Sequence, residues 1–108
     1  MPTYNKLVRD KIPEILEKNN LAYRLKHLDK DQFHTAIQEK FQEEWTEYQQ
    51  AVNNEEAVEE LADLLEVIFA MTEIHGRTKE ELLAVRQRKF IDRGGFYQKC
   101  YLLEVEDK

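Results

Sequence analysis

The chain of 108 residues contains no serine, one cysteine, two prolines and three glycines. The missing serine excludes every mechanism that depends on a serine nucleophile. The single cysteine, Cys100, cannot form an internal disulfide, which fits a reducing cytoplasm. No apolar run approaches the roughly 18 residues of a membrane span, and the first residues lack the apolar region of a secretory signal. We therefore expect a cytoplasmic protein without a membrane anchor.

Basic residues are missing from one long stretch. Residues 41–76 hold nine Glu and one Asp but no Lys or Arg, while the other positions carry all 16 basic residues. The net charge of −6 argues against a nucleic-acid groove. An acidic block of this density repels itself unless it is well solvated or neutralised by bound cations.

Length and periodicity indicate one mainly α domain over residues 1–108, too short for a TIM barrel or a two-domain dinucleotide enzyme. Capping residues and apolar spacing predict a helical bundle of four to five helices. The expected helices cover about 11–19 with Asp10 as N-cap, from Asp29 or Asp31 to about 53, about 55–75, and from Thr78 to about 92. Residues 21–28 and 96–105 have strand-like composition and could pair as a small two-stranded antiparallel appendage.

Some acids occupy helix positions where apolar residues belong. Taking Phe33 as zero at 100° per residue, the apolar arc of the second helix runs from about −60° to +100°. Glu44 lies at about 20° and Glu47 at about −40°, both inside this arc, with Lys40 beside them. On the third helix Glu60 falls among the apolar residues, and Asp63 lies at the edge of their arc.

These displaced acids form two pairs with a spacing of three, Glu44 with Glu47 and Glu60 with Asp63. Residues three apart share a helix face, and antiparallel helices would bring the pairs together. Four ionised carboxylates in a partly dry cleft are costly unless cations neutralise them, and all-oxygen ligands suit Mg²⁺ or Mn²⁺. Solvated acids, or acids that form salt bridges between subunits, are the alternative, because Glu is common on helix surfaces.

With these paired acids, the chain resembles the all-α nucleoside triphosphate pyrophosphatases, a superfamily that includes MazG-like proteins and phosphoribosyl-ATP pyrophosphohydrolases. The segments KFQEEWTE (40–47) and EELADLL (59–65) resemble the E-x-x-E and E-x-x-D signature of that superfamily. YNKLVRDKIP (4–13) and KFIDRGGF (89–96) resemble a compact MazG-like, phosphoribosyl-ATP pyrophosphohydrolase-like subgroup. Together these segments extend the resemblance over nearly the whole chain.

The resemblance implies Mg²⁺-dependent hydrolysis of a nucleoside triphosphate, canonical or modified, to the monophosphate and pyrophosphate. Glu44, Glu47, Glu60 and Asp63 would then be the metal-binding and catalytic residues, with Mn²⁺ as a substitute ion. Basic residues should contact the phosphates, and Asn5 could contact the sugar or base, although each is equally compatible with a solvated surface position. The candidate substrate-binding residues are Asn5, Lys6, Arg9, Lys40, Lys89 and Arg93.

The third helix is apolar over nearly 200° of its circumference, more than one neighbouring helix covers, so we expect a homo-oligomer. The resemblance implies a homodimer or a homotetramer. The leading functional hypothesis is a nucleotide pyrophosphohydrolase. The alternatives are a phosphoribosyl-ATP pyrophosphohydrolase of histidine biosynthesis and a non-catalytic α-helical binding or adaptor protein.

Overall fold

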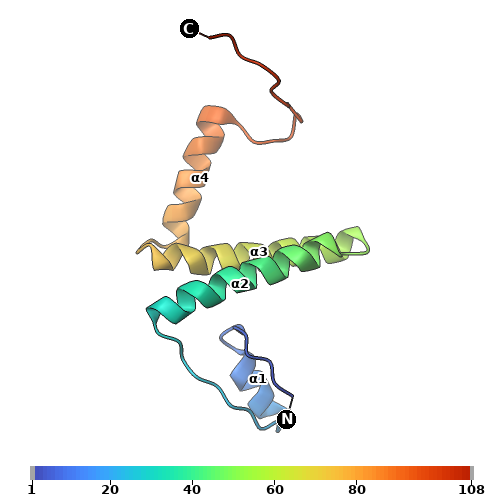
Figure 1. Ribbon diagram of the computed structural model, residues 1–108, viewed down its shortest axis with the longest axis vertical. Coiled ribbons are helices and arrows are strands. Elements are labelled where there is room, and N and C mark those ends of the chain that lie inside the picture. Colours follow the sequence, from blue (N-terminus) through green and yellow to red (C-terminus); the bar gives the residue numbers. More distant parts are fainter. Residues whose placement is uncertain (1, 108) are drawn as a thin grey trace.

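Four helices account for the regular structure in the computed structural model, which describes residues 2–107 (Figure 1). They are α1 (Ile12–Lys18), α2 (Lys30–Gln49), α3 (Asn54–Ile74) and α4 (Lys79–Arg93). The all-α class expected from the sequence is therefore confirmed. Among the described residues, no helix is both long enough and apolar enough to cross a membrane.

Side-chain caps fix where the three longer helices begin. Asp29 and Gln32 form a capping box at the start of α2, with hydrogen bonds of 2.8 and 3.1 Å. Asn53 accepts a bond from the Glu56 N–H at α3, and Thr78 accepts one from the Glu81 N–H at α4. The predicted bounds of α1 were close, but its predicted N-cap was wrong, because the N-cap is Lys11, which makes no side-chain cap bond, and not Asp10.

Helices α2 and α3 form an antiparallel hairpin, joined by residues 50–53 (Figure 1). Its apolar centre consists of Ile37 from α2 with Leu64 and Val67 from α3, each of which is buried. Helix α2 ends at Gln49 and not near residue 53 as expected. The reason is the cap of the next helix, since Asn53 adopts an extended conformation to accept the Glu56 N–H and the chain must leave α2 before it.

The remaining parts of the chain lie on opposite sides of this hairpin (Figure 1). Helix α1 and the segment before it lie on one side, while α4 packs only against α3 and extends away on the other. The expected two-stranded appendage is not present within residues 2–107. Residues 21–28 follow α1 and residues 96–105 follow α4, so the hairpin separates the two segments and they cannot pair.

The hairpin is much better packed than the rest of the chain. The radius of gyration is 18.5 Å, whereas a compact chain of this length has a radius of about 13 Å. The extents of 64 × 36 × 23 Å reflect the projecting α4 and the extended segment after it. One chain therefore consists of an α2–α3 hairpin from which α1 and α4 extend on opposite sides, and it does not form a closed helical bundle by itself.

Candidate functional site

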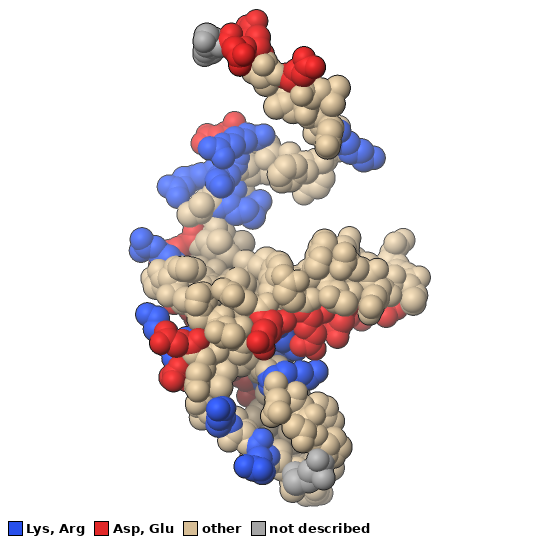
Figure 2. Space-filling view, in the orientation of Figure 1, with Lys and Arg blue, Asp and Glu red and all other residues tan. Residues whose placement is uncertain are grey.

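Three carboxylates meet where α2 and α3 pack together. Glu44 and Glu47 come from α2 and Glu60 from α3, and one oxygen of each lies within 4.8 Å of the others. Glu44 is only 6% exposed, Glu60 is half-buried and Glu47 is exposed. Acidic side chains line the side of the hairpin that faces the N-terminal part of the chain (Figure 2). The cluster therefore has a buried base and one member open to solvent.

The buried part of this cluster is not electrostatically satisfied by the protein. One oxygen of Glu44 and one of Glu60 are buried without a hydrogen-bond partner. Burial, together with the neighbouring Glu47 and Glu44 carboxyls, raises the pKa of Glu60 from 4.5 to about 7. Burial and Glu47 also raise the pKa of Glu44, although Glu60 and Lys40 act in the opposite direction. A bound cation would favour the ionised form of both groups.

The donor set fits a hard divalent cation. All the converging atoms are carboxylate oxygens, which Mg²⁺ and Mn²⁺ prefer. Adjacent oxygens around an octahedral Mg²⁺ are about 2.9 Å apart, so oxygens that lie within 4.8 Å of one another must draw closer to share one ion. A bound divalent ion would also satisfy the two buried oxygens that have no partner. Glu44, Glu47 and Glu60 are thus the residues that can hold a metal here.

Asp63, the fourth predicted acid, pairs with a basic residue of the N-terminal segment. Its Oδ1 accepts a hydrogen bond from Arg9 Nη2. Lys6 of the same segment reaches α2, where its Nζ lies 3.3 Å from Glu43 Oε1. Two ion pairs therefore hold the N-terminal segment across the acidic side of the hairpin, one to each helix.

Glu43 was not among the predicted site residues, yet it pairs with both Lys6 and Lys40 beside the cluster. Lys40 Nζ lies 3.4 Å from both Glu43 Oε2 and Glu44 Oε1. Burial acts to raise the pKa of Glu43, but Lys40 and Lys6 outweigh it and hold the pKa below its ordinary value. The helical phase contained the signal, because Glu43 falls at about −80°, next to Glu47, when Phe33 is set at zero.

The other predicted binding residues do not reach the cluster within one chain. Lys89 and Arg93 lie on α4, which extends from the opposite side of the hairpin (Figures 1 and 2). Asn5 is exposed and has a φ of 45°, a left-handed conformation that Asn tolerates in turns. Of the six candidate substrate-binding residues, the structure brings Lys6, Arg9 and Lys40 to the acids.

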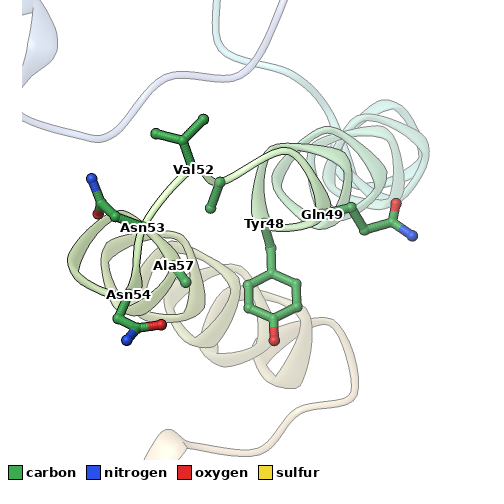
Figure 3. Close-up of a pocket in the computed structure, with 7 residues that line it drawn as sticks. Tyr48, Gln49, Val52, Asn53, Asn54 and Ala57 are labelled. Atoms are coloured by element: carbon green, nitrogen blue, oxygen red, sulfur yellow. The ribbon is translucent and has the colours of Figure 1, made fainter.

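Two shallow hollows lie on the hairpin, and neither is lined by the predicted metal ligands. Figure 3 shows the first, at the turn between α2 and α3, which Tyr48, Asn53 and Ala57 help to line. The second lies between α2 residues such as Gln38 and Met71 of α3. Trp45 stacks on Tyr48 near the first hollow, with ring centroids 5.6 Å apart. Neither hollow therefore encloses the carboxylate cluster.

Paired acids on two antiparallel helices are the arrangement of the all-α nucleoside triphosphate pyrophosphatases, the MazG-like superfamily. The family model described as "Phosphoribosyl-ATP pyrophosphohydrolase" matches residues 2–89. The chain belongs to this family. No curated protein and no solved structure shows significant similarity to it.

Proposed function

We propose that this protein is a Mg²⁺-dependent pyrophosphohydrolase that cleaves a nucleoside or deoxynucleoside triphosphate to the monophosphate and pyrophosphate. The observation that carries the proposal is the convergence of Glu44, Glu47 and Glu60, with two buried oxygens that have no protein partner. Membership of a pyrophosphohydrolase family supports the same reaction class.

In the proposed reaction, water attacks the α-phosphorus and the bond from that phosphorus to the α–β bridging oxygen breaks. Pyrophosphate leaves with the electron pair of that bond, and the attacking water loses a proton to a carboxylate, Glu44 or Glu47. When bound, Mg²⁺ would neutralise phosphate charge and lower the pKa of water. Glu44, Glu47 and Glu60 would hold the ion, with Asp63 joining them once Arg9 releases it.

Basic residues of the N-terminal segment are placed to bind the phosphates. Lys6 and Arg9 already lie across the acidic side of the hairpin, and Lys40 lies at its buried edge. Arg9 suits two-point contact with a phosphate, and the lysines supply point charges. We propose that these three residues bind the triphosphate, and that the active form is a homodimer or homotetramer in the cytoplasm.

Turnover with product analysis tests the proposal. Purified protein is incubated with Mg²⁺ and a panel of canonical, deoxy and modified triphosphates. We expect monophosphate and pyrophosphate, lost on chelation of the metal and lost in Glu60→Gln. Orthophosphate with a nucleoside diphosphate would contradict the proposed cleavage position. Absence of turnover across the panel, with folded protein, would favour a binding or adaptor role.

Phosphoribosyl-ATP is the second candidate substrate, and the description of the matching family favours it. The same carboxylates would serve, because that reaction also releases pyrophosphate from a nucleotide. Including phosphoribosyl-ATP in the panel separates the two functions. A kcat/KM for phosphoribosyl-ATP far above those for the triphosphates would assign the protein to the histidine pathway. The reverse order would assign it to nucleotide clearance.

A further inference from the structure

Several large apolar side chains between residues 94 and 107 are largely exposed. Phe96 is 97% exposed and Tyr101 is 88% exposed. Leu102, Leu103 and Val105 are also largely exposed, on a segment that extends past the end of α4 (Figure 1). Isolated exposed apolar residues are ordinary, but so many within residues 96–105 indicate a surface that is covered in the working protein.

The exposed area of the whole chain supports this conclusion. The chain exposes 10,291 Å², whereas a compact monomer of 13.0 kDa exposes about 6,300 Å². The excess of about 4,000 Å² per chain is several times the roughly 800 Å² that each partner buries in a standard interface. Only three apolar side chains are buried among the described residues. Burial against a second copy would supply the missing core.

The hairpin offers a matching apolar surface. Val58, Leu61 and Leu65 project from α3 and are about half exposed or more, and Trp45 of α2 is 41% exposed. The face of the hairpin turned to the viewer in Figure 2 carries few charged residues. Val58, Leu61 and Leu65 are spaced by three and four along α3 and so share one face of that helix, on which an apolar segment can pack.

The charges of the α2–α3 hairpin and of α4 are complementary, which also favours contact between two copies of the chain. The hairpin between residues 41 and 76 has no basic residue, whereas the second half of α4 carries Arg86, Arg88, Lys89 and Arg93. None of these four makes an ion pair with any residue between 2 and 107. Basic side chains gather over α4 in Figure 2, on the opposite side of the hairpin from the row of acidic side chains along α2 and α3. Within one chain the basic residues of α4 do not reach the acids of the hairpin, but α4 of one chain can reach the hairpin of another.

We propose that α4 and residues 94–107, here termed the C-terminal arm, dock on the α2–α3 hairpin of a second copy of this chain. The apolar side chains of the arm cover the exposed face of the partner's α3, and Lys89 and Arg93 come to the partner's carboxylate cluster. This second part rests on the proposed function, because it assigns those two residues to the phosphates of the substrate.

Cysteine-directed cross-linking tests the docking without any assay of activity. The single cysteine, Cys100, lies exposed in the arm, so a benzophenone maleimide attached there samples what the arm contacts. Protein labelled with ¹⁵N is mixed and refolded with unlabelled protein. We expect cross-links between a heavy and a light chain that join the arm to residues 54–74. Cross-links confined to one chain, or arm to arm, would overturn the proposal, as would a monomeric wild type.

A matched pair of substitutions tests the apolar contact. Leu102→Asp places a charge on a side chain that the partner should cover, whereas Gln98→Asp adds the same charge at an exposed polar position. We expect Leu102→Asp to weaken self-association by about tenfold or more and Gln98→Asp to change it little. Equal association constants for the two variants, measured by sedimentation equilibrium, would exclude a role for the arm.

Complementation between inactive variants tests the shared site. Glu60→Gln removes an acid, and the double variant Lys89→Ala with Arg93→Ala removes the basic residues of the arm. When the two are refolded together at equal amounts, mixed dimers contain one site with both parts intact, so we expect about a quarter of wild-type activity. If turnover stays at the level of the separate variants, the basic residues act within their own chain. If the wild type is inactive, cross-linking still decides the docking.

Discussion

Glu60 is the residue whose environment departs furthest from that of a solvated side chain. In the metal-free protein its pKa is about 7, against 4.5 for the ordinary carboxyl. Between pH 4.5 and pH 7, Glu60 therefore keeps its proton in the folded state but has lost it in the unfolded state. The free energy of unfolding should therefore fall as pH rises from about 4.5 to 7. A carboxylate stabilised by an ion pair has the opposite effect, since its pKa is lowered and the free energy of unfolding then rises with pH.

Glu60→Gln should remove this dependence. Glutamine is neutral at every pH and nearly isosteric, so the metal-free variant should be more stable than the wild type above pH 7 and change less between pH 5 and 8. Urea unfolding with chelator at several pH values measures both effects. Parallel curves for the two proteins would show that Glu60 ionises freely in the folded state.

Arg9 should compete with the metal, because it occupies Asp63 in the metal-free structure. The Arg9 side chain is 59% exposed and the Asp63 side chain 36%, so displacing Arg9 costs little more than an exposed ion pair is worth. We expect Arg9→Ala to tighten Mn²⁺ binding by about two- to fivefold and to raise the KM for the nucleotide. Calorimetric titration of the metal separates the first effect from the second.

Lys26→Ala is the control for this prediction. It removes the same charge from the exposed segment between α1 and α2, where Lys26 makes no ion pair with any other described residue. Its metal affinity should match the wild type. Weaker metal binding in Arg9→Ala would mean that Arg9 supports the site and does not compete for it.

Helical phase was sufficient to find the three converging acids, because each lies at an apolar position of its own helix. It could not find the partner of Asp63. Arg9 is 54 residues away in sequence, on an irregular segment whose path depends on tertiary contacts. Local periodicity carries no information about such a pair.

At the level of helices, the caps were readable in advance because a cap is a contact between residues three positions apart. Asp29 and Thr78 occupy cap positions as expected, whereas Asn53, expected at the end of the second helix, caps α3. Asp10 was wrongly expected to cap α1, a helix of only seven residues whose start has no side-chain cap. The strands predicted at 21–28 and 96–105 failed for another reason, since a strand needs a neighbour and composition alone does not place one.

The cap at Asn53 also positions the metal site, because Glu60 lies two turns into the helix that it starts. Asn53→Ala should destabilise the protein by about 1 kcal/mol through loss of the bond to the Glu56 N–H. Fraying of the first turn of α3 should weaken metal binding as well. Thermal unfolding with and without Mg²⁺ measures the two losses.

Asn54→Ala provides the matched comparison. Asn54 is the first residue of α3, is exposed and does not cap the helix. Its melting temperature should remain near that of the wild type. If Asn53→Ala and Asn54→Ala lower the melting temperature equally, the loss comes from removing any asparagine in the turn and not from removing the cap.

For the whole molecule, a chain with three buried apolar side chains among those described should not be stable alone. Folding should therefore be linked to association, and the melting temperature should rise with protein concentration. Light scattering should give a mass of at least twice 13.0 kDa. A melting temperature that does not change between low and high micromolar concentration would contradict this linkage.

The sequence already indicated association, because α3 is apolar over more of its surface than α2 can cover. It did not indicate which surfaces meet. That information depends on where α4 and the segment after it project, and this direction is set at the turn around Gly76, whose φ is 70°. A single left-handed residue at a helix end redirects every residue that follows, and periodicity does not record such a change.

The short connection between α2 and α3 has a kinetic consequence. Glu44, Glu47 and Glu60 lie within 16 residues of one another in sequence, across a turn of four residues. Contacts of such low contact order form early, because closing a short loop takes well under a microsecond. The carboxylates therefore meet before α1 and α4 find their positions. A divalent ion bound at that stage would increase the rate of refolding more than it slows unfolding.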